Sequence, residues 1–372
     1  MQKTSDIENI ENARMVTNDQ SRGIRQAGWS PDSTTILFLQ DFEGDENFHL
    51  WSIDASAEGV EAKDLTPGKD VKASNLLVNK RFKDEILVGT NERDATCFDM
   101  YRVNYKTGER TLDTKNPGDV LGWGSEDESF EIREALVKNQ ADSSEVIRVR
   151  DSKDAEWRDL KTFPYGEDGN LVDFSKDGKT CWMKSSIGRE TAALEKVDLQ
   201  TGETIETVAY NEKCDCGGVI LDDDTKELRA VSYNYARKER VFFDKELEKD
   251  YEILEKLGPD DAESGVVSST DDEKTWVVAY SRSEGPTEYV IYDQEKKEIK
   301  PLFVSKPELL NYKFAPMEDI RVKARDGLEL VGYLTRADKE KKTPLILLVH
   351  GGPWARDFWG FNTQAQVSTV MM

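Results

Sequence analysis

The chain has 372 residues, and its 51 Lys and Arg against 74 Asp and Glu give a net charge of −23. A surface this acidic repels phosphate backbones and anionic lipid, so binding to nucleic acid or to a membrane is not expected. Hydrophobic residues make up 37% of the chain and aromatic residues 9%, which suits a folded protein with a modest core, and no apolar stretch approaches the roughly 20 residues of a membrane helix.

The N-terminal segment 1–21 is polar and acidic and does not resemble a signal peptide. Among the four cysteines, Cys214 and Cys216 are separated by a single residue, and neither a second pair nor a nearby His completes a zinc site. We therefore predict no metal and no cofactor. So few cysteines fit a reducing compartment, and the sequence predicts a cytoplasmic protein.

Two markers repeat along the next 280 or so residues, and they run in phase. The first is a short apolar strand that ends in an acidic or amide residue, with copies 46 to 50 residues apart. Its six copies end at Asp54, Asn104, Asp151, Asp198, Asp244 and Asp293. The second marker is a polar turn before an apolar run, as in "WSPDSTTILFL" from Trp29. Asp, Ser, Lys and Gly are frequent in it because they tolerate the backbone angles of a tight hairpin.

A repeat of about 48 residues built from strands and turns is typical of a four-stranded β-propeller blade. A β-sandwich would show irregular spacing, and a helical solenoid would need a 3.6-residue period, which is confined to Lys245 to Leu257. The sequence therefore predicts a mainly β protein with a β-propeller over 22–304. Six blades are recognisable, and they form either a complete ring or part of a seven-bladed one.

The composition changes after a linker over 305–318. Residues 319–334 alternate around Arg325-Asp326-Gly327 and predict a hairpin. The run from Pro344 to Val349 is apolar throughout, as expected for a strand covered on both faces of a parallel sheet. It stops at His350, which two glycines and a proline follow.

Four segments together resemble the prolyl oligopeptidase family of serine peptidases, in particular its acylaminoacyl-peptidase-like branch. They are "LQDFEGDENFHLW", "VGTNERDATCFDMYRVN", "ARDGLELVGYL" and "HGGPWARDFWGFN". The resemblance runs through most of the chain. It implies a propeller followed by an α/β-hydrolase domain, whose first strands would occupy 319–372. It also implies acylaminoacyl- or dipeptidyl-peptidase-like hydrolysis of short peptides, with the propeller restricting substrate access.

The same resemblance assigns an oxyanion hole to the loop after the apolar run. A rigid backbone N–H there stabilises the charge of the tetrahedral intermediate, and glycine leaves the substrate's approach open. By the family pattern Gly352 donates this N–H, His350 and Gly351 shape the loop, and Pro353 stiffens its exit.

A complete site also needs a serine in a G-x-S-x-G elbow, followed along the chain by Asp and His. The sequence contains no such elbow, since Lys184 precedes Ser186, and Trp123 precedes Ser125, where the first glycine is required. The resemblance places the triad beyond the chain end, so we expect no catalytic residue of the triad and no activity from this chain alone. We also expect the tail 319–372 to be poorly packed or merely docked on the propeller. The alternative is a non-enzymatic propeller that serves as a binding module or pseudoenzyme.

Two charged loops precede marker strands in adjacent units, and a charged pair follows the glycine-rich loop. The residues are Asp45, Glu46, Asn47, Glu92 and Arg93 in the loops, and Arg356 and Asp357 in the pair. The loops either line the propeller's opening and read a peptide terminus or simply hold blades together, and we favour the second interpretation. The pair contacts propeller or substrate, or forms an ordinary surface ion pair.

Overall fold

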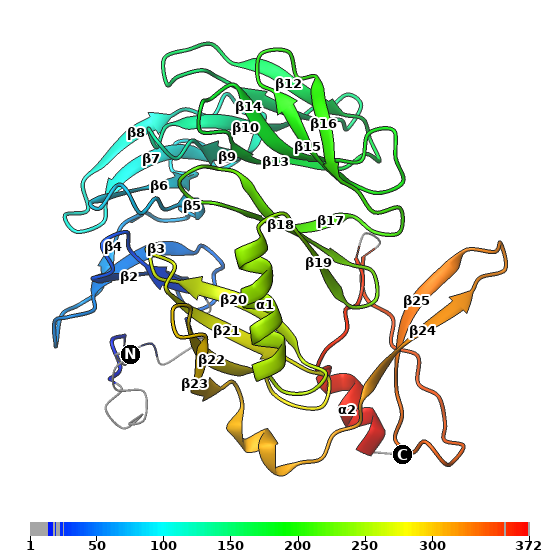
Figure 1. Ribbon diagram of the computed structural model, residues 1–372. Coiled ribbons are helices and arrows are strands. Elements are labelled where there is room, and N and C mark those ends of the chain that lie inside the picture. Colours follow the sequence, from blue (N-terminus) through cyan, green and yellow to red (C-terminus); the bar gives the residue numbers. More distant parts are fainter. Residues whose placement is uncertain (1–13, 18, 20–22, 25, 353–354, 371–372) are drawn as a thin grey trace. The chain divides into compact units, whose positions relative to one another are not determined.

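The computed structural model describes residues 14–17, 19, 23–24, 26–352 and 355–370 (Figure 1). Most of the predicted polar segment 1–21 and the predicted loop residue Pro353 lie outside the described residues. Contacts divide the chain into a first unit, residues 1–208 with 224–226, and a second unit, residues 209–223 with 227–372.

Over residues 26–304 six antiparallel sheets follow one another, and within each sheet the strands lie side by side in chain order. The first comprises β1 (Gln26–Trp29), β2 (Thr35–Gln40), β3 (His49–Asp54) and β4 (Lys63–Asp64). The second comprises β5 (Ala73–Leu77), β6 (Glu85–Thr90), β7 (Asp99–Asn104) and β8 (Arg110–Thr114). The third comprises β9 (Val120–Ser125), β10 (Ile132–Lys138), β11 (Glu145–Val149) and β12 (Arg158–Phe163).

The remaining three sheets continue the same order. The fourth comprises β13 (Gly169–Phe174), β14 (Thr180–Ser185), β15 (Ala193–Asp198) and β16 (Thr204–Ala209). The fifth comprises β17 (Cys216–Leu221), β18 (Leu228–Asn234) and β19 (Lys238–Phe242). The sixth comprises β20 (Glu263–Ser269), β21 (Thr275–Ser281), β22 (Glu288–Asp293) and β23 (Glu298–Val304). The predicted mainly β fold with six recognisable propeller blades is confirmed.

The fifth sheet differs from the four-stranded unit that the repeat predicts. In the described residues 216–258 it has three strands, and α1 (Lys245–Leu257) follows its third strand. The side chain of Asp244 caps this helix by accepting the N–H groups of Glu246 and Leu247, at 2.8 and 3.2 Å. The helix has the bounds of the one stretch of the sequence with helical periodicity. Here the local period produces a helix where the repeat predicts a fourth strand.

The acidic repeat marker has a local structural cause. Asp54, Asn104, Asp198 and Asp293 end the third strands of their sheets, whereas Asp151 lies two residues beyond β11. Each of the four side chains accepts backbone N–H groups two or three residues further on, at 2.8 to 3.0 Å. Such bonds form the next turn without help from distant residues. Much of the periodic acidity therefore builds turns.

The core of the first unit lies between consecutive sheets, because both faces of their middle strands are apolar. Side chains buried between the first two sheets include Leu37, Leu50, Ile86 and Val103. Those between the second and third include Leu87, Met100, Phe130 and Ile132, and those between the third and fourth include Ile147, Phe163, Met183 and Val197. In this unit each sheet thus completes the core of the sheet before it.

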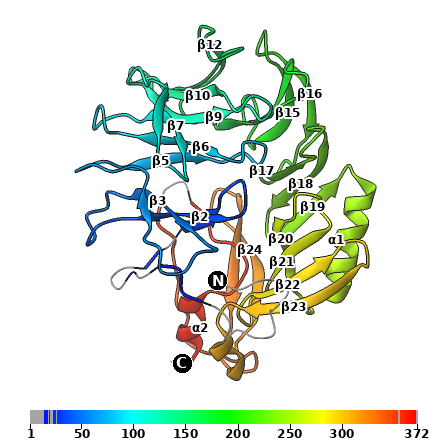
Figure 2. The ribbon, with the colours of Figure 1, turned by 90° about the vertical axis from the view of Figure 1, so that its left-hand side faces the viewer.

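The second unit has a comparable core in which the helix takes part. Leu247, Tyr251 and Leu254 of α1 pack with Trp276 and Tyr292 of the sixth sheet, and α1 lies against that sheet (Figure 2). The fully buried carboxylate of Asp250 accepts a hydrogen bond from the Tyr292 hydroxyl at 2.6 Å.

After η3 (Pro307–Asn311), β24 (Met317–Lys323) and β25 (Glu329–Thr335) form the predicted hairpin, with Gly327 at φ 95° in its turn. The predicted strand over Pro344–Val349 is wrong, since this run is irregular and Leu345 to Val349 are 44–84% exposed. A strand needs a neighbour for its ladder, and none of the described residues pairs with this run. The chain continues to α2 (Thr363–Val370). Over the described ranges, the longest helices fall short of the length and hydropathy needed to cross a membrane.

Glu134 on β10 is a carboxyl group in an unfavourable environment. It pairs in register with Gly124 on β9, where an added Cβ would lie 2.1 Å from Oε2 of Glu134, so the glycine makes room for this side chain. Burial, reinforced by the nearby Asp173 carboxylate, raises the pKa of Glu134 to about 7. A raised carboxyl pKa means that the folded chain holds this proton more tightly than the unfolded chain, so stability falls as the pH rises from about 4.5 through 7.

Replacing Glu134 by Gln should therefore stabilise the protein at alkaline pH. We expect Glu134→Gln to raise the free energy of unfolding at pH 8 by about 1 to 3 kcal/mol, and to have little effect at pH 4.5, where the wild-type carboxyl is protonated. Urea denaturation at both pH values measures this, with Glu61→Gln at an exposed site as the control. Equal or lower stability of Glu134→Gln at pH 8 would contradict the prediction.

Candidate functional site

The three oxyanion candidates lie in the loop after the exposed apolar run. His350 and Gly351 are exposed, and Nδ1 of His350 lies 2.8 Å from the carbonyl oxygen of Gly351. Gly352 has φ 155°, which residues with a side chain rarely adopt, whereas an added Cβ at Gly351 would meet nothing within 4 Å. The backbone thus requires glycine at position 352 and not at 351.

Arg356 contacts the turn between β18 and β19. Its NH1 donates to the carbonyl oxygen of Asn234 at 2.7 Å, and its NH2 donates to that of Tyr235 at 2.6 Å. The guanidinium also lies 4.8 Å from the centre of the Phe358 ring. Its contact with Asp357 is a 3.3 Å bond from Nε to the backbone oxygen, not a pairing of side chains. Of the alternatives for this residue, contact with a propeller sheet is the one observed.

Trp359 anchors the chain three residues further on. Its side chain is 7% exposed, and its Nε1 donates to the carbonyl oxygen of Met317 at 2.8 Å. The Arg237 guanidinium lies 3.4 Å from the ring centre and is held by Asp261 and Glu263, at 3.0 and 2.9 Å. The sequence analysis missed this pair, because residues 122 positions apart carry no local signal of contact.

Gln366 of α2 provides the second anchor. Its side chain is 4% exposed and donates to the carbonyl oxygens of Ala315 and Ser283, at 2.7 and 3.2 Å, while its Oε1 accepts the Ala315 N–H at 3.1 Å. The tail was expected to be either poorly packed or docked, and each description fits one part of it. Residues 344–350 are exposed, and 355–370 are docked within the second unit.

The loop between β2 and β3 contains Asp45, Glu46 and Asn47. The Asp45 carboxylate accepts the N–H groups of Asn47 and Phe42, at 3.0 and 3.2 Å, and the bond from Asn47 is the main cause of its lowered pKa. Glu43 and Glu46 have φ 51° and 59°, and both side chains are exposed. Asp45 and Asn47 shape the loop, which presents Glu46 to solvent.

The loop between β6 and β7 contains Glu92 and Arg93, and both are held by the second sheet. Arg93 donates two hydrogen bonds to the buried Asp99, at 2.5 and 2.8 Å, and a third to the carbonyl oxygen of Asn116 at 3.0 Å. Burial raises the pKa of Asp99, but the hydrogen bonds from Arg93 and the Asn116 N–H, together with the charges of Arg93 and Lys115, bring it below its usual value. Glu92 pairs with Arg110 at 2.8 Å. These contacts tie the loop to β7, to β8 and to the residues just after β8.

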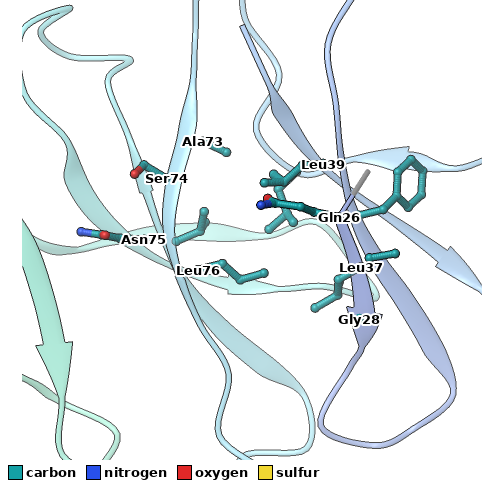
Figure 3. A pocket seen from close by; sticks show the side chains of 12 residues that line it. Gln26, Gly28, Leu37, Leu39, Ala73, Ser74, Asn75 and Leu76 are labelled. Atoms are coloured by element: carbon teal, nitrogen blue, oxygen red, sulfur yellow. The ribbon is translucent and has the colours of Figure 1, made fainter. Parts of the chain in front are cut away.

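A cavity of about 460 Å³ lies between the first two sheets of the first unit (Figure 3). Its lining is mainly apolar, and Leu76 points toward Leu37 and Leu39 across it (Figure 3). β5 is bulged between Ser74 and Leu77, and Asn75 has φ 47°. A bulge re-aims side chains, so this strand departs from regular pairing at the cavity wall. The sequence analysis did not predict the cavity, and no candidate residue lines it.

No family model matches the chain. It is 37% identical over 369 residues to dipeptidyl aminopeptidase BIII of Pseudoxanthomonas mexicana, which covers 95% of this chain and 52% of that protein. It is 23% identical over 387 residues to dipeptidyl peptidase family member 6 of Caenorhabditis elegans, with 94% and 52% covered. The chain thus spans about half the length of the curated relatives it matches.

Solved structures agree on the fold. A puromycin-hydrolyzing peptidase of Mycobacterium tuberculosis superposes with a TM-score of 0.62 at 15% identity, covering 90% of this chain and 54% of that one. Prolyl oligopeptidase B from Galerina marginata gives 0.55 at 13% identity, covering 84% and 46%.

The six sheets and the hairpin form a propeller fold like that of these solved peptidases. These likenesses bear out the resemblance to the prolyl oligopeptidase family of serine peptidases that the sequence motifs predicted. Within the part of the chain that the structure describes, no group of three or more His, Cys, Asp or Glu is arranged to hold a metal.

The two parts of the tail should differ in amide hydrogen exchange. We expect the amides of Leu345 to Val349 to exchange near the rate of an unstructured chain, because no strand ladder protects them. We expect the Gln366 amide to exchange more slowly, because it donates a hydrogen bond to the carbonyl oxygen of Asn362 at 3.0 Å. Exchange followed by mass spectrometry measures both in one sample, so each segment is the control for the other. Strong protection of 345–349 would contradict the prediction.

Proposed function

We propose that this chain is the propeller and oxyanion-loop part of a serine-type dipeptidyl aminopeptidase that acts on short peptides. The observation that carries the proposal is the 37% identity to a dipeptidyl aminopeptidase over 95% of the chain. The serine, aspartate and histidine of the reaction belong, in this proposal, to the portion of the relatives that the chain does not span. The cytoplasmic location stays a prediction.

In this reaction a serine hydroxyl, deprotonated by histidine, attacks the scissile carbonyl. The carbonyl oxygen then becomes an oxyanion that needs preorganised hydrogen-bond donors. We assign one donor to the backbone N–H of Gly352, because the φ of 155° at this position supports a requirement for glycine. His350 and Gly351 lead into the loop, and the bonds from Arg356 to Asn234 and Tyr235 hold its far side.

A dipeptidyl aminopeptidase must also recognise a free, positively charged N-terminus, which calls for a carboxylate. We assign this role to Glu46. Its side chain is exposed, and within the described ranges its carboxylate makes no hydrogen bond or ion pair. The neighbouring Asp45 carboxylate is occupied by backbone N–H groups, and Glu92 is paired with Arg110. An acylated N-terminus is uncharged and gains nothing from Glu46, so this assignment favours dipeptidyl over acylaminoacyl specificity.

The activity is tested on the full-length gene product with chromogenic dipeptide amides, free or acetylated at the N-terminus. Release of the chromophore from the free form alone is the expected result. Faster release of the chromophore from the acetylated form would indicate acylaminoacyl-peptidase specificity instead. Turnover of neither, together with no labelling by a fluorophosphonate, would favour the non-enzymatic propeller.

The two loop glycines provide a matched pair of variants in that enzyme. Gly352→Ala forces a side chain onto a strained backbone and displaces the oxyanion donor, so we expect kcat to fall by about 100-fold with little change in KM. Gly351→Ala places its methyl group in open space and should stay close to wild type. Steady-state kinetics measures both. Equal effects of the two substitutions would contradict the assignment to Gly352.

The role of Glu46 predicts a change in binding. Glu46→Gln keeps the shape of the side chain but removes the charge, so we expect KM for free dipeptide substrates to rise by about 10-fold, and kcat to be nearly unchanged. The exposed Glu58→Gln serves as the control for a general loss of negative charge. If both variants raise KM equally, recognition of the N-terminus does not depend on Glu46.

A further inference from the structure

The cavity between the first two sheets is bordered by two strands that each have one open side. Among the strands that the structure describes, β1 pairs only with β2, and β5 pairs only with β6. Gln26 to Gly28 of β1 and Ala73 to Leu76 of β5 line the cavity from opposite sides (Figure 3). All four residues of β1 are exposed. An exposed strand with an open side can accept a further strand, because its N–H and C=O groups on that side lack ladder partners.

The cavity has room for a side chain because a glycine lies at its wall. Gly28 is opposite Leu37 in the ladder, so both positions face the same side of the sheet. An added Cβ at Gly28 would meet no atom within 4 Å. Leu37, Leu50 and Val88 are exposed by 2% or less and form an apolar floor. An apolar side chain that entered here would leave water for an apolar environment, which is favourable.

Hydrogen-bonding groups lie beside this floor. The side-chain amide of Gln26 extends into the cavity toward β5 (Figure 3), and within the described residues it has no hydrogen-bond partner. The ladder between β5 and β6 passes directly from Ser74 to Leu77, so β5 is bulged over Asn75 and Leu76. A bulge leaves its extra residue without a ladder bond. Side-chain and backbone amide groups are therefore both available at the cavity wall.

The lining favours one kind of occupant. None of the twelve residues that line the cavity is charged, so a charged group would lose its hydration without compensation. A second copy of the chain carries the same net charge of −23 and is repelled. A purely apolar small molecule would cover the floor and leave the amide groups unused. An extended peptide uses both, since its main chain bonds to a strand edge while its side chain enters a pocket.

We propose that this cavity binds a short, extended and uncharged peptide segment, which places one apolar side chain on the floor and bonds its main chain to the open side of β1 or to the bulge of β5. The volume of about 460 Å³ exceeds that of a single side chain, so part of the main chain enters as well. The site lies within the first unit and uses no residue assigned to the reaction, so it stands or falls independently of the proposed function.

The probe is the amidated pentapeptide Ser-Thr-Leu-Thr-Ser with an uncharged coumarin on its N-terminus, titrated with the 372-residue chain and followed by fluorescence anisotropy. We expect saturable binding, and about 10-fold weaker binding when alanine replaces the peptide's leucine, because apolar area is no longer buried. Methylation of two of the peptide's backbone nitrogens should also weaken binding by about 10-fold, because it removes donors to the strand edge.

Two glycines provide matched variants of the protein. Gly28→Leu fills the cavity and should weaken binding of the leucine peptide by about 10-fold or more. Gly265→Leu is the control, because Gly265 also lies in the first strand of a sheet, β20, and an added Cβ there also meets nothing within 4 Å. Gly265 does not line the cavity, so its variant should bind the peptide like wild type.

Three outcomes overturn the proposal. These are the absence of saturable binding up to about 1 mM protein, equal binding of the leucine and alanine peptides, and equal effects of Gly28→Leu and Gly265→Leu. Full binding of the methylated peptide would show a site for small apolar molecules and would reject strand addition. If Gly28→Leu does not fold, Gln26→Ala at an exposed position decides, since it removes the free amide, and unchanged affinity in that variant would reject the peptide site.

Discussion

The whole structure depends on one constraint, which is that a sheet with two apolar faces must be covered on both. Ile86 and Val103 of the second sheet cover the first, while Leu87 and Met100 of the same sheet cover the third. Strand alternation sends these residues to opposite faces, so each sheet contributes to two cores. Loops at the sheet ends are then free to differ, which is how one repeat can carry cavities, charged loops and a helix.

The acidic composition follows from the way the turns are made. Carboxylates such as Asp32, Asp177 and Asp272 accept the N–H two residues further on, at 3.1 to 3.2 Å, in the turns between first and second strands. These interactions are local, and they form in the first, fourth and sixth sheets without help from neighbouring sheets. The abundance of Asp and Glu therefore identifies few binding residues, and the exceptions are groups such as Glu46 and Glu134, whose carboxylates are not satisfied by a turn.

The glycine-rich loop lies between an exposed run and a docked segment. Arg356 and Trp359 fix the chain just after it, through carbonyl oxygens and a cation–π contact, whereas Leu345 to Val349 before it are 44–84% exposed. The contacts that fix the backbone near Gly352 therefore come from the residues that follow it in the chain. In the proposed enzyme the fifth sheet, through its turn at Asn234 and Tyr235, helps to set where the oxyanion donor lies.

The sequence by itself determined the repeat, the turns, the helix over Lys245–Leu257, the hairpin and the family, because each depends on patterns within a few residues. It did not determine the three-stranded fifth sheet, the exposure of Leu345 to Val349, the Arg237–Trp359 contact or the binding of Lys226 by Asp127 and Asp173. These depend on which segments meet across roughly 50 to 120 residues of chain. An alternating strand pattern predicts that a side chain will be buried. Only the tertiary structure decides which residues bury it, because burial and ion pairing each need a partner from another part of the chain.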